Sequence, residues 1–279
     1  MKYQNQTIQT HAIKTQLYRW YTLYEREQNE IRVSNQVKIL SDDIVISSAS
    51  GEVKGKKAYT QFVKVYEGWK NAHQLESFEV NNQSIDATII FQSIKPDGHK
   101  SQTRIAYNIA LEEIPNGLPL LQQIQIKPIE QQELVTFKDT YPHNRVMALM
   151  HYWLCHIERM DGNPEPFIYV LAKDFELHFS KDNVVTTIDA FEKWVKKSAQ
   201  AVKSTNHFPE NILVNCISDN LFELNVEFIW RGTSNEGQAL QAHTVHKWII
   251  EDNVNDLFAK IKKMEVAYKI PFSPIKSSN

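Results

Sequence analysis

The sequence contains two His-x-x-Glu motifs, whose residue types and spacing could support acid–base chemistry. The first joins His73 to Glu76, and the second joins His207 to Glu210, 134 positions later. A buried carboxylate must find a partner or take up a proton, and an imidazole changes charge near neutral pH. Each glutamate shares strand parity with apolar residues further along, so Glu76 and Glu210 are expected to face the core and line a pocket.

Each of these four residues also has a structural interpretation. A glutamate at the start of a strand can be solvated or can accept a bond from a neighbouring backbone amide. A histidine between a helix and a strand can bond the preceding carbonyls or line the mouth of a pocket. Structural use is the commoner one for both residue types, and the sequence leaves catalytic use open.

A late strand pattern in each half supplies a further pair of candidates. Tyr107 shares parity with bulky apolar residues around it, and His246 holds the corresponding position in the second half. Both are therefore predicted to face the helices, whereas Arg104 and His243 face the other way. His243 and His246 are three apart on a strand and cannot bind one ion together, so no metal site is expected.

These candidates recur because the elements that position them recur. Residues 18–26 and 151–159 both look helical and share a tryptophan, Trp20 or Trp153, and a Glu-Arg pair, 133 positions apart. Further segments match in the same order: 40–46 with 171–177, 58–63 with 190–195, 104–111 with 243–250, and 121–126 with 261–266. The sequence therefore predicts an internal duplication, with domains at 1–130 and 144–279 and a linker at 131–143. The alternative is chance resemblance inside one α+β domain.

The order of elements resembles that of a known superfamily. Each copy reads helix, helix, strand, helix and then strands to the end, with a hairpin at Gly51 to Gly55 in the first copy, and residues 40–59 lead to His73. This pattern resembles the nuclear transport factor 2-like superfamily, especially its SnoaL-like branch. The resemblance covers nearly the whole chain twice and implies two tandem cone-shaped α+β barrels, each a curved, mostly antiparallel sheet wrapped around helices. It also implies an internal pseudo-dimer, and hence a monomer in solution.

The resemblance does not carry over the ketosteroid isomerase mechanism found in that superfamily, which needs an aspartate base and an oxyanion hole of tyrosine and protonated aspartate. The base position matches Ser48 in the first copy and Phe179 in the second. The oxyanion positions match Trp20 with Tyr107, and Trp153 with His246. The isomerase constellation is therefore absent.

Composition limits the classes of partner. A net charge of −2 with 23% charged residues gives no electrostatic basis for binding nucleic acid or an anionic membrane. Cys155 and Cys216 lack the spacing of a zinc site or a disulfide scaffold. Residues 1–14 lack the apolar run of a signal peptide, so a cytoplasmic location is expected. No Gly-rich phosphate loop occurs, and no cofactor is expected.

Three functions are compatible with these patterns. The first is a binding module for an apolar, ring-bearing small molecule. The second is an enzyme of the polyketide cyclase, dehydratase or isomerase kind, with Glu210 or His246 as general base. The third is an interaction protein that packs its outer sheet faces together. The expected ligand-binding residues are Trp20, His73, Glu76, Tyr107, Trp153, His207, Glu210 and His246, and the two tryptophans have core packing as their ordinary alternative.

Overall fold

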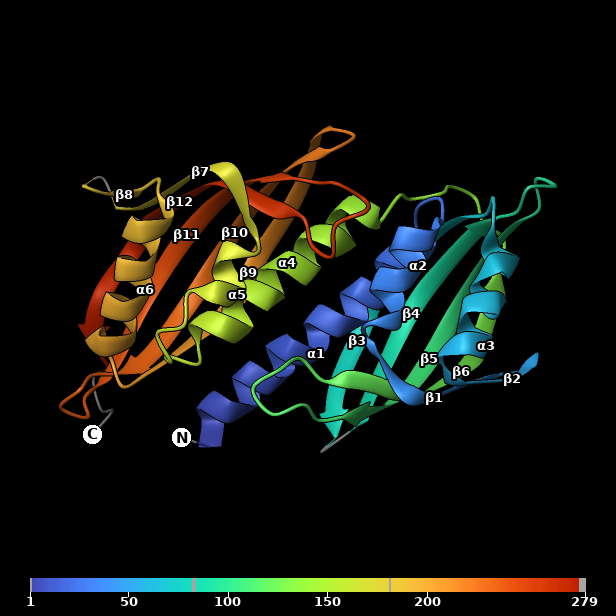
Figure 1. The fold of residues 1–279 in the computed structure, drawn as a ribbon, viewed down its shortest axis with the longest axis horizontal. Coiled ribbons are helices and arrows are strands. Elements are labelled where there is room, and N and C mark those ends of the chain that lie inside the picture. The colour runs from blue at the N-terminus through green and yellow to red at the C-terminus, as the bar shows by residue number, and fades with distance from the viewer. Residues whose placement is uncertain (1, 82–83, 181, 276–279) are drawn as a thin grey trace. The chain divides into compact units, whose positions relative to one another are not determined.

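The computed structural model describes residues 2–81, 84–180 and 182–275 and contains two six-stranded sheets, each with its own helices (Figure 1). The strand order is β2-β1-β6-β5-β4-β3 in the first sheet and β8-β7-β12-β11-β10-β9 in the second. In each sheet one pair is parallel, β1 with β6 and β7 with β12, and the other pairs are antiparallel. Because the second order repeats the first element by element, the predicted duplication and the α+β class are confirmed.

The elements of the first repeat run from α1 to β6. Their bounds are α1 Lys2–Tyr24, α2 Glu30–Val37, β1 Leu40–Ser48, β2 Gly51–Lys54, α3 Gly55–Phe62, the 3-10 helix η1 Val63–Tyr66, β3 Lys70–Asn81, β4 Ser84–Ile94, β5 Lys100–Glu112 and β6 Leu120–Gln132.

The second repeat runs from α4 to β12. Its elements are α4 Tyr141–Ile157, α5 Glu165–Ile168, β7 Leu171–Ser180, β8 Asn183–Val185, α6 Ile188–Ala201, β9 Ser204–Ser218, β10 Leu221–Thr233, β11 Ala239–Glu251 and β12 Lys260–Pro274. Residues 133–140, between β6 and α4, form neither helix nor strand.

Helix α6 shows why these residues fold as they do. Thr187 caps it by accepting a hydrogen bond from the Ala190 backbone N–H, and Asp189 places negative charge in the first turn. Phe191 and Val195 are buried four residues apart, on one face. The helix therefore packs on its sheet through one apolar stripe.

Alternation along the strands defines the core. On β10 the buried side chains are Phe222, Leu224, Val226, Phe228 and Trp230, and the residues between them are partly exposed. This period of two gives the sheet one apolar face, on which the helices pack. No helix of the described residues is long and apolar enough to cross a membrane.

The chain divides into two compact units, one around each sheet. The first sheet's unit contains residues 13–148 and 254–257, and the second sheet's unit contains 1–12, 149–253 and 258–279. The units thus differ from the expected division at 1–130 and 144–279, because the first half of α1 belongs to the second sheet's unit. The predicted internal pseudo-dimer stays a prediction.

Candidate functional site

The second repeat encloses a cavity of about 500 Å³. This volume is in the range of small-molecule sites. The lining residues include no Lys, Arg, Asp or Glu among those described, and most are apolar. Eight are aromatic: Trp153, Phe179, Trp194, Phe228, Trp230, Trp248, Tyr268 and Phe272. Phe179 and Trp194 stack face to face with their ring centroids 3.7 Å apart.

The first repeat has a much smaller cavity, of about 80 Å³. Trp20, His73 and Tyr107 line it, together with seven other residues. The corresponding predicted residues of the second repeat, Trp153, His207 and His246, all line the larger cavity. Six of the eight predicted site residues therefore lie on cavity walls, in two equivalent triplets.

The two glutamates of the His-x-x-Glu motifs lie elsewhere. Glu76 is exposed and accepts a hydrogen bond from Arg104 Nε at 2.7 Å, and Glu210 is exposed as well. The predicted inward orientation is wrong for both, because each strand carries a β-bulge at this place. The register of β3 slips between Leu75 and Ser77, and that of β9 slips after Glu210. An extra residue in a strand reverses the parity of those beside it, so Glu210 is no longer a candidate base.

In the first repeat, the histidine contacts a different carboxylate. Glu25, near the end of the first helical segment, is buried, and its Oε1 accepts bonds from the backbone N–H of His73 at 2.8 Å and from the side chain of Asn144 at 2.7 Å. Thr140 Oγ1 also donates to this oxygen at 2.8 Å. His73 Nδ1 lies 3.1 Å from it. The histidine is thus fixed in place by a buried carboxylate.

The second repeat has the same pair at Glu158 and His207. Glu158 Oε1 accepts the backbone N–H of His207, and His207 Nδ1 lies 3.3 Å away. When Nδ1 carries the proton that it shares with the carboxylate, Nε2 is left as a proton acceptor. His207 lines the cavity, and its Nδ1 contacts the carboxylate. The Glu158–His207 pair therefore lies at the wall of a largely apolar pocket.

A third residue completes each pair at equivalent places. His11 Nε2 lies 3.5 Å from Glu158 Oε1 and 3.2 Å from the carbonyl oxygen of His207. In the first repeat, Asn144 makes the same two contacts, to Glu25 and to the carbonyl of His73. His11 and Asn144 are 133 positions apart, the offset of the tryptophans. Each network thus lies within one compact unit.

The polar groups of the second repeat differ in their charge near neutral pH. Burial alone raises the pKa of Glu158, but hydrogen bonds from His11 and His207 outweigh it and lower the pKa to about 2. Burial, reinforced by His207, lowers the pKa of His246 to about 3. Near neutral pH the cavity wall therefore carries an uncharged His246, and the Glu158 carboxylate that contacts His207 is ionised.

Glu25 and Glu158 are the residues of the candidate site that motif reasoning missed. Both belong to the Glu-Arg pair that recurs 133 positions apart, which was the signal available in the sequence. A glutamate near a helix end is usually solvated, so its type alone does not predict burial. Among the described residues, no group of three potential metal ligands is close enough to hold an ion.

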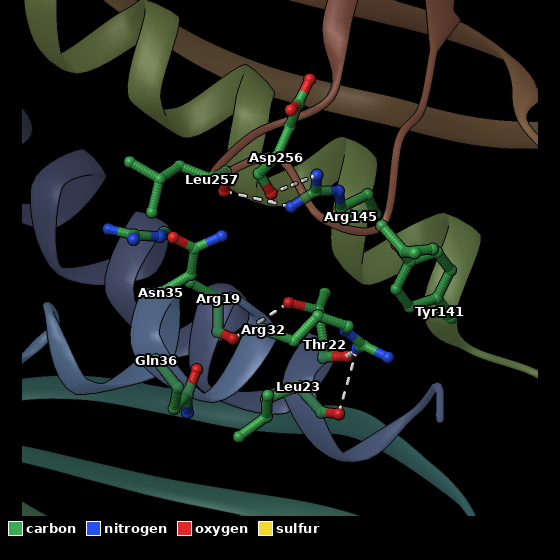
Figure 2. Close-up of a pocket in the computed structure, with 11 residues that line it drawn as sticks. Arg19, Thr22, Leu23, Arg32, Asn35, Gln36, Tyr141, Arg145, Asp256 and Leu257 are labelled. Carbon is green, nitrogen blue, oxygen red and sulfur yellow. Dashed lines mark hydrogen bonds between the residues drawn. The ribbon is translucent and has the colours of Figure 1, made fainter. Parts of the chain in front are cut away.

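A third pocket, polar and of about 30 Å³, is lined by three arginines whose contacts stabilise the fold (Figure 2). Arg32 donates to the carbonyls of Thr22 at 2.7 Å and Leu23 at 3.1 Å, in the last turn of α1. Arg145 donates to the carbonyls of Asp256 at 2.8 Å and Leu257 at 3.1 Å. These guanidinium groups satisfy backbone oxygens, including those that a helix end leaves free, and so stabilise the fold.

The strand order and the helices of each repeat define an α+β domain, and the chain contains two such domains in tandem. The likeness to the nuclear transport factor 2-like superfamily stays a resemblance. No family model matches the sequence, and no curated protein matches it. Similar solved structures each cover about half of this chain. Hexachlorocyclohexane dehydrochlorinase LinA-type3 from Novosphingobium barchaimii LL02 is 13% identical over 48% of this chain and 90% of its own, with a TM-score of 0.43.

Two further structures show similar values. A protein from Novosphingobium aromaticivorans DSM 12444, provisionally described as a scytalone dehydratase, is 14% identical over 48% of this chain and 87% of its own, with a TM-score of 0.43. An uncharacterised protein with a cystatin-like fold from Caulobacter vibrioides is 12% identical over 47% of this chain and 91% of its own, with a TM-score of 0.39. No activity is transferred from these proteins to this chain.

Proposed function

We propose that the second repeat binds a neutral, largely apolar, ring-bearing small molecule. The observation that carries the proposal is the cavity of about 500 Å³ with eight aromatic walls. Flat aromatic walls favour a flat ligand, because offset and edge-on ring contacts add to the burial of apolar area. The first repeat, with about 80 Å³, has no room for such a ligand.

The polar groups of the lining favour a neutral ligand. No described lining residue carries a permanent charge, and His246 is uncharged near neutral pH because burial lowers its pKa to about 3. A carboxylate or ammonium group would enter without a counter-ion and would lose its hydration. His207 Nε2 can instead accept a hydrogen bond from a hydroxyl group of the ligand.

A thermal-shift titration with a matched pair of probes tests this function. We expect 2-naphthol, which is neutral at pH 7, to raise the unfolding temperature. Naphthalene-2-carboxylate has the same ring system but carries a negative charge at this pH, and it should leave the unfolding temperature unchanged. A probe at a hundred times its Kd stabilises the folded form by about 2.7 kcal/mol. Equal shifts from the two probes, or none from 2-naphthol and related neutral bicyclic rings, would contradict the proposal.

A second candidate function is proton abstraction from the bound molecule, favoured by the Glu158–His207 pair. A buried carboxylate that holds Nδ1 fixes the tautomer in which Nε2 is the base. With 2-tetralone as probe, we expect the protein to accelerate exchange of the protons next to the carbonyl in D₂O, followed by NMR. His207→Gln should abolish the acceleration. His73→Gln, the matched change in the first repeat, should preserve it, and exchange that survives His207→Gln would exclude this function.

A further inference from the structure

The two repeats share a fold and have site residues at three equivalent positions, yet their cavities measure about 500 Å³ in the second repeat and about 80 Å³ in the first. The difference has to arise from side chains at equivalent positions. The strand registers and the Glu–His pair that both repeats contain define which side chains are equivalent.

The first difference lies at the end of the leading helix. Tyr24 stands directly before Glu25, and Ile157 stands directly before Glu158. Tyr24 and Ile157 line their respective cavities. The hydroxyl groups of Tyr24 and Tyr59 are hydrogen-bonded at 2.8 Å, which holds the Tyr24 ring in the first cavity.

The second repeat lacks both members of that hydroxyl pair. Phe191 takes the place of Tyr59, since each contacts the tryptophan of the leading helix, at centroid distances of 6.0 Å and 5.6 Å. Without a hydroxyl group on Phe191, a tyrosine at position 157 would have no such partner there. The second repeat therefore lacks both the ring of Tyr24 and the hydroxyl group of Tyr59 that holds this ring in place.

The second difference lies on the helix after the short hairpin. Counting from Tyr59 and Phe191, Tyr66 of η1 corresponds to Ser198 of α6, and both line their cavities. The Tyr66 ring packs edge-on against Tyr24, with centroids 5.2 Å apart. Ser198 contributes no ring at this place, so the second cavity is open there.

Two other pairs of equivalent ring positions act in the opposite direction. Phe62 corresponds to Trp194, and Phe91, opposite His73, corresponds to Trp230, opposite His207. Both changes place the larger ring in the second repeat, which would shrink the larger cavity. Tyr24 and Tyr66 are the positions where the first repeat carries a ring and the second does not.

We propose that positions 157 and 198 decide which repeat holds a ligand: Ile157 and Ser198 leave the second cavity open, and Tyr24 with Tyr66 fills the first. Ser198 and Ile157 are thus specificity-determining residues, and the first repeat is a closed copy. The proposal rests on the proposed function for its meaning in ligand selection. The claim that the second cavity is empty and the first is filled can be tested separately.

Xenon tests the empty space without reference to any natural ligand, because it enters apolar cavities that have room for it. In xenon-pressurised crystals of the full-length protein, we expect occupancy in the second repeat only. Ser198→Tyr should lower that occupancy, and Ser198→Ala, which adds no ring, should retain it. The Tyr24→Ile/Tyr66→Ser double variant should show xenon in both repeats.

Binding of 2-naphthol tests the link to function. We expect Ser198→Tyr to weaken binding at least tenfold and the double variant to raise the stoichiometry from one probe to two per chain. If Ser198→Tyr does not fold, as judged by circular dichroism, Ile157→Tyr replaces it. Unchanged xenon occupancy in the folded closing variant, or no new occupancy in the double variant, would overturn the inference. Xenon results as expected without 2-naphthol binding would contradict only the proposed function.

Discussion

Glu158 is the buried group on which acid should act most strongly. Its hydrogen bonds from His11 and His207 lower the pKa to about 2, from 4.5 for an ordinary glutamate. Because the folded pKa lies below the unfolded one, the ionised carboxylate stabilises the protein above about pH 4.5, and this stabilisation is lost as the pH falls toward 2. We expect Glu158→Gln to cost on the order of 3 kcal/mol at pH 7 and little at pH 2, measured by urea unfolding.

Glu210→Gln is the matched control for this measurement. Glu210 is exposed and should change the free energy of unfolding by less than about 0.5 kcal/mol at every pH. Parallel curves of the free energy of unfolding against pH for wild type and Glu158→Gln would show that the carboxylate does not stabilise the fold through its charge.

At this scale the sequence predicts well where repetition and strand parity agree. Trp20 with Trp153 and Tyr107 with His246 lie on the cavity walls, and a ligand-binding role for them stays a prediction. Glu158 was not predicted, because its burial depends on donors such as His11 and His207 that are far away in the sequence. Local pattern carries no information on such partners.

At the scale of elements, two bulges explain the failed prediction for the glutamates. Period-two reasoning assumes an unbroken strand, and both β3 and β9 break that period near the His-x-x-Glu motif. Asn211, beside the second bulge, has φ of 50°, a left-handed conformation that asparagine tolerates better than most residues. The recurrence of bulges at equivalent places indicates that they belong to the fold and aim the histidine into the cone.

The first half of α1 makes a testable contribution to the second network. His11 holds the place that Asn144 holds in the first repeat, with contacts to the glutamate and to the histidine carbonyl. His11→Asn keeps a donor of similar reach and should lie within about 0.5 kcal/mol of wild type in unfolding free energy. His11→Leu removes one buried donor from Glu158 Oε1 and from the carbonyl of His207 and should cost about 1–3 kcal/mol.

Denaturant unfolding of the two variants at pH 7 measures this difference. Asn144→Leu, the equivalent change in the first repeat, is the control and should lose a similar amount. If His11→Asn and His11→Leu were equally stable, the hydrogen bonds of His11 would not contribute to the free energy of unfolding, and its contacts would act through packing alone.

At the scale of the molecule, the duplication was readable from the sequence but the compact units were not. Matching segments identify which residues share an ancestor, whereas a compact unit is defined by which residues touch. Residues 1–12 belong by sequence to the first repeat and by contact to the unit of the second sheet. Only the folded chain shows this, because the helical pattern of α1 is continuous across residue 12.

Removal of residues 1–12 should therefore damage the repeat that is farther away in the sequence. The truncated chain loses His11, beside Glu158 and His207, and Thr7, whose hydroxyl group donates to Asn206 at 2.6 Å. We expect faster amide hydrogen exchange in β9 around His207, with β4 and β5 of the first repeat protected as in the full-length chain. Exchange that rises equally in both sheets, or only in the first, would show that this segment does not act through the network of the second repeat.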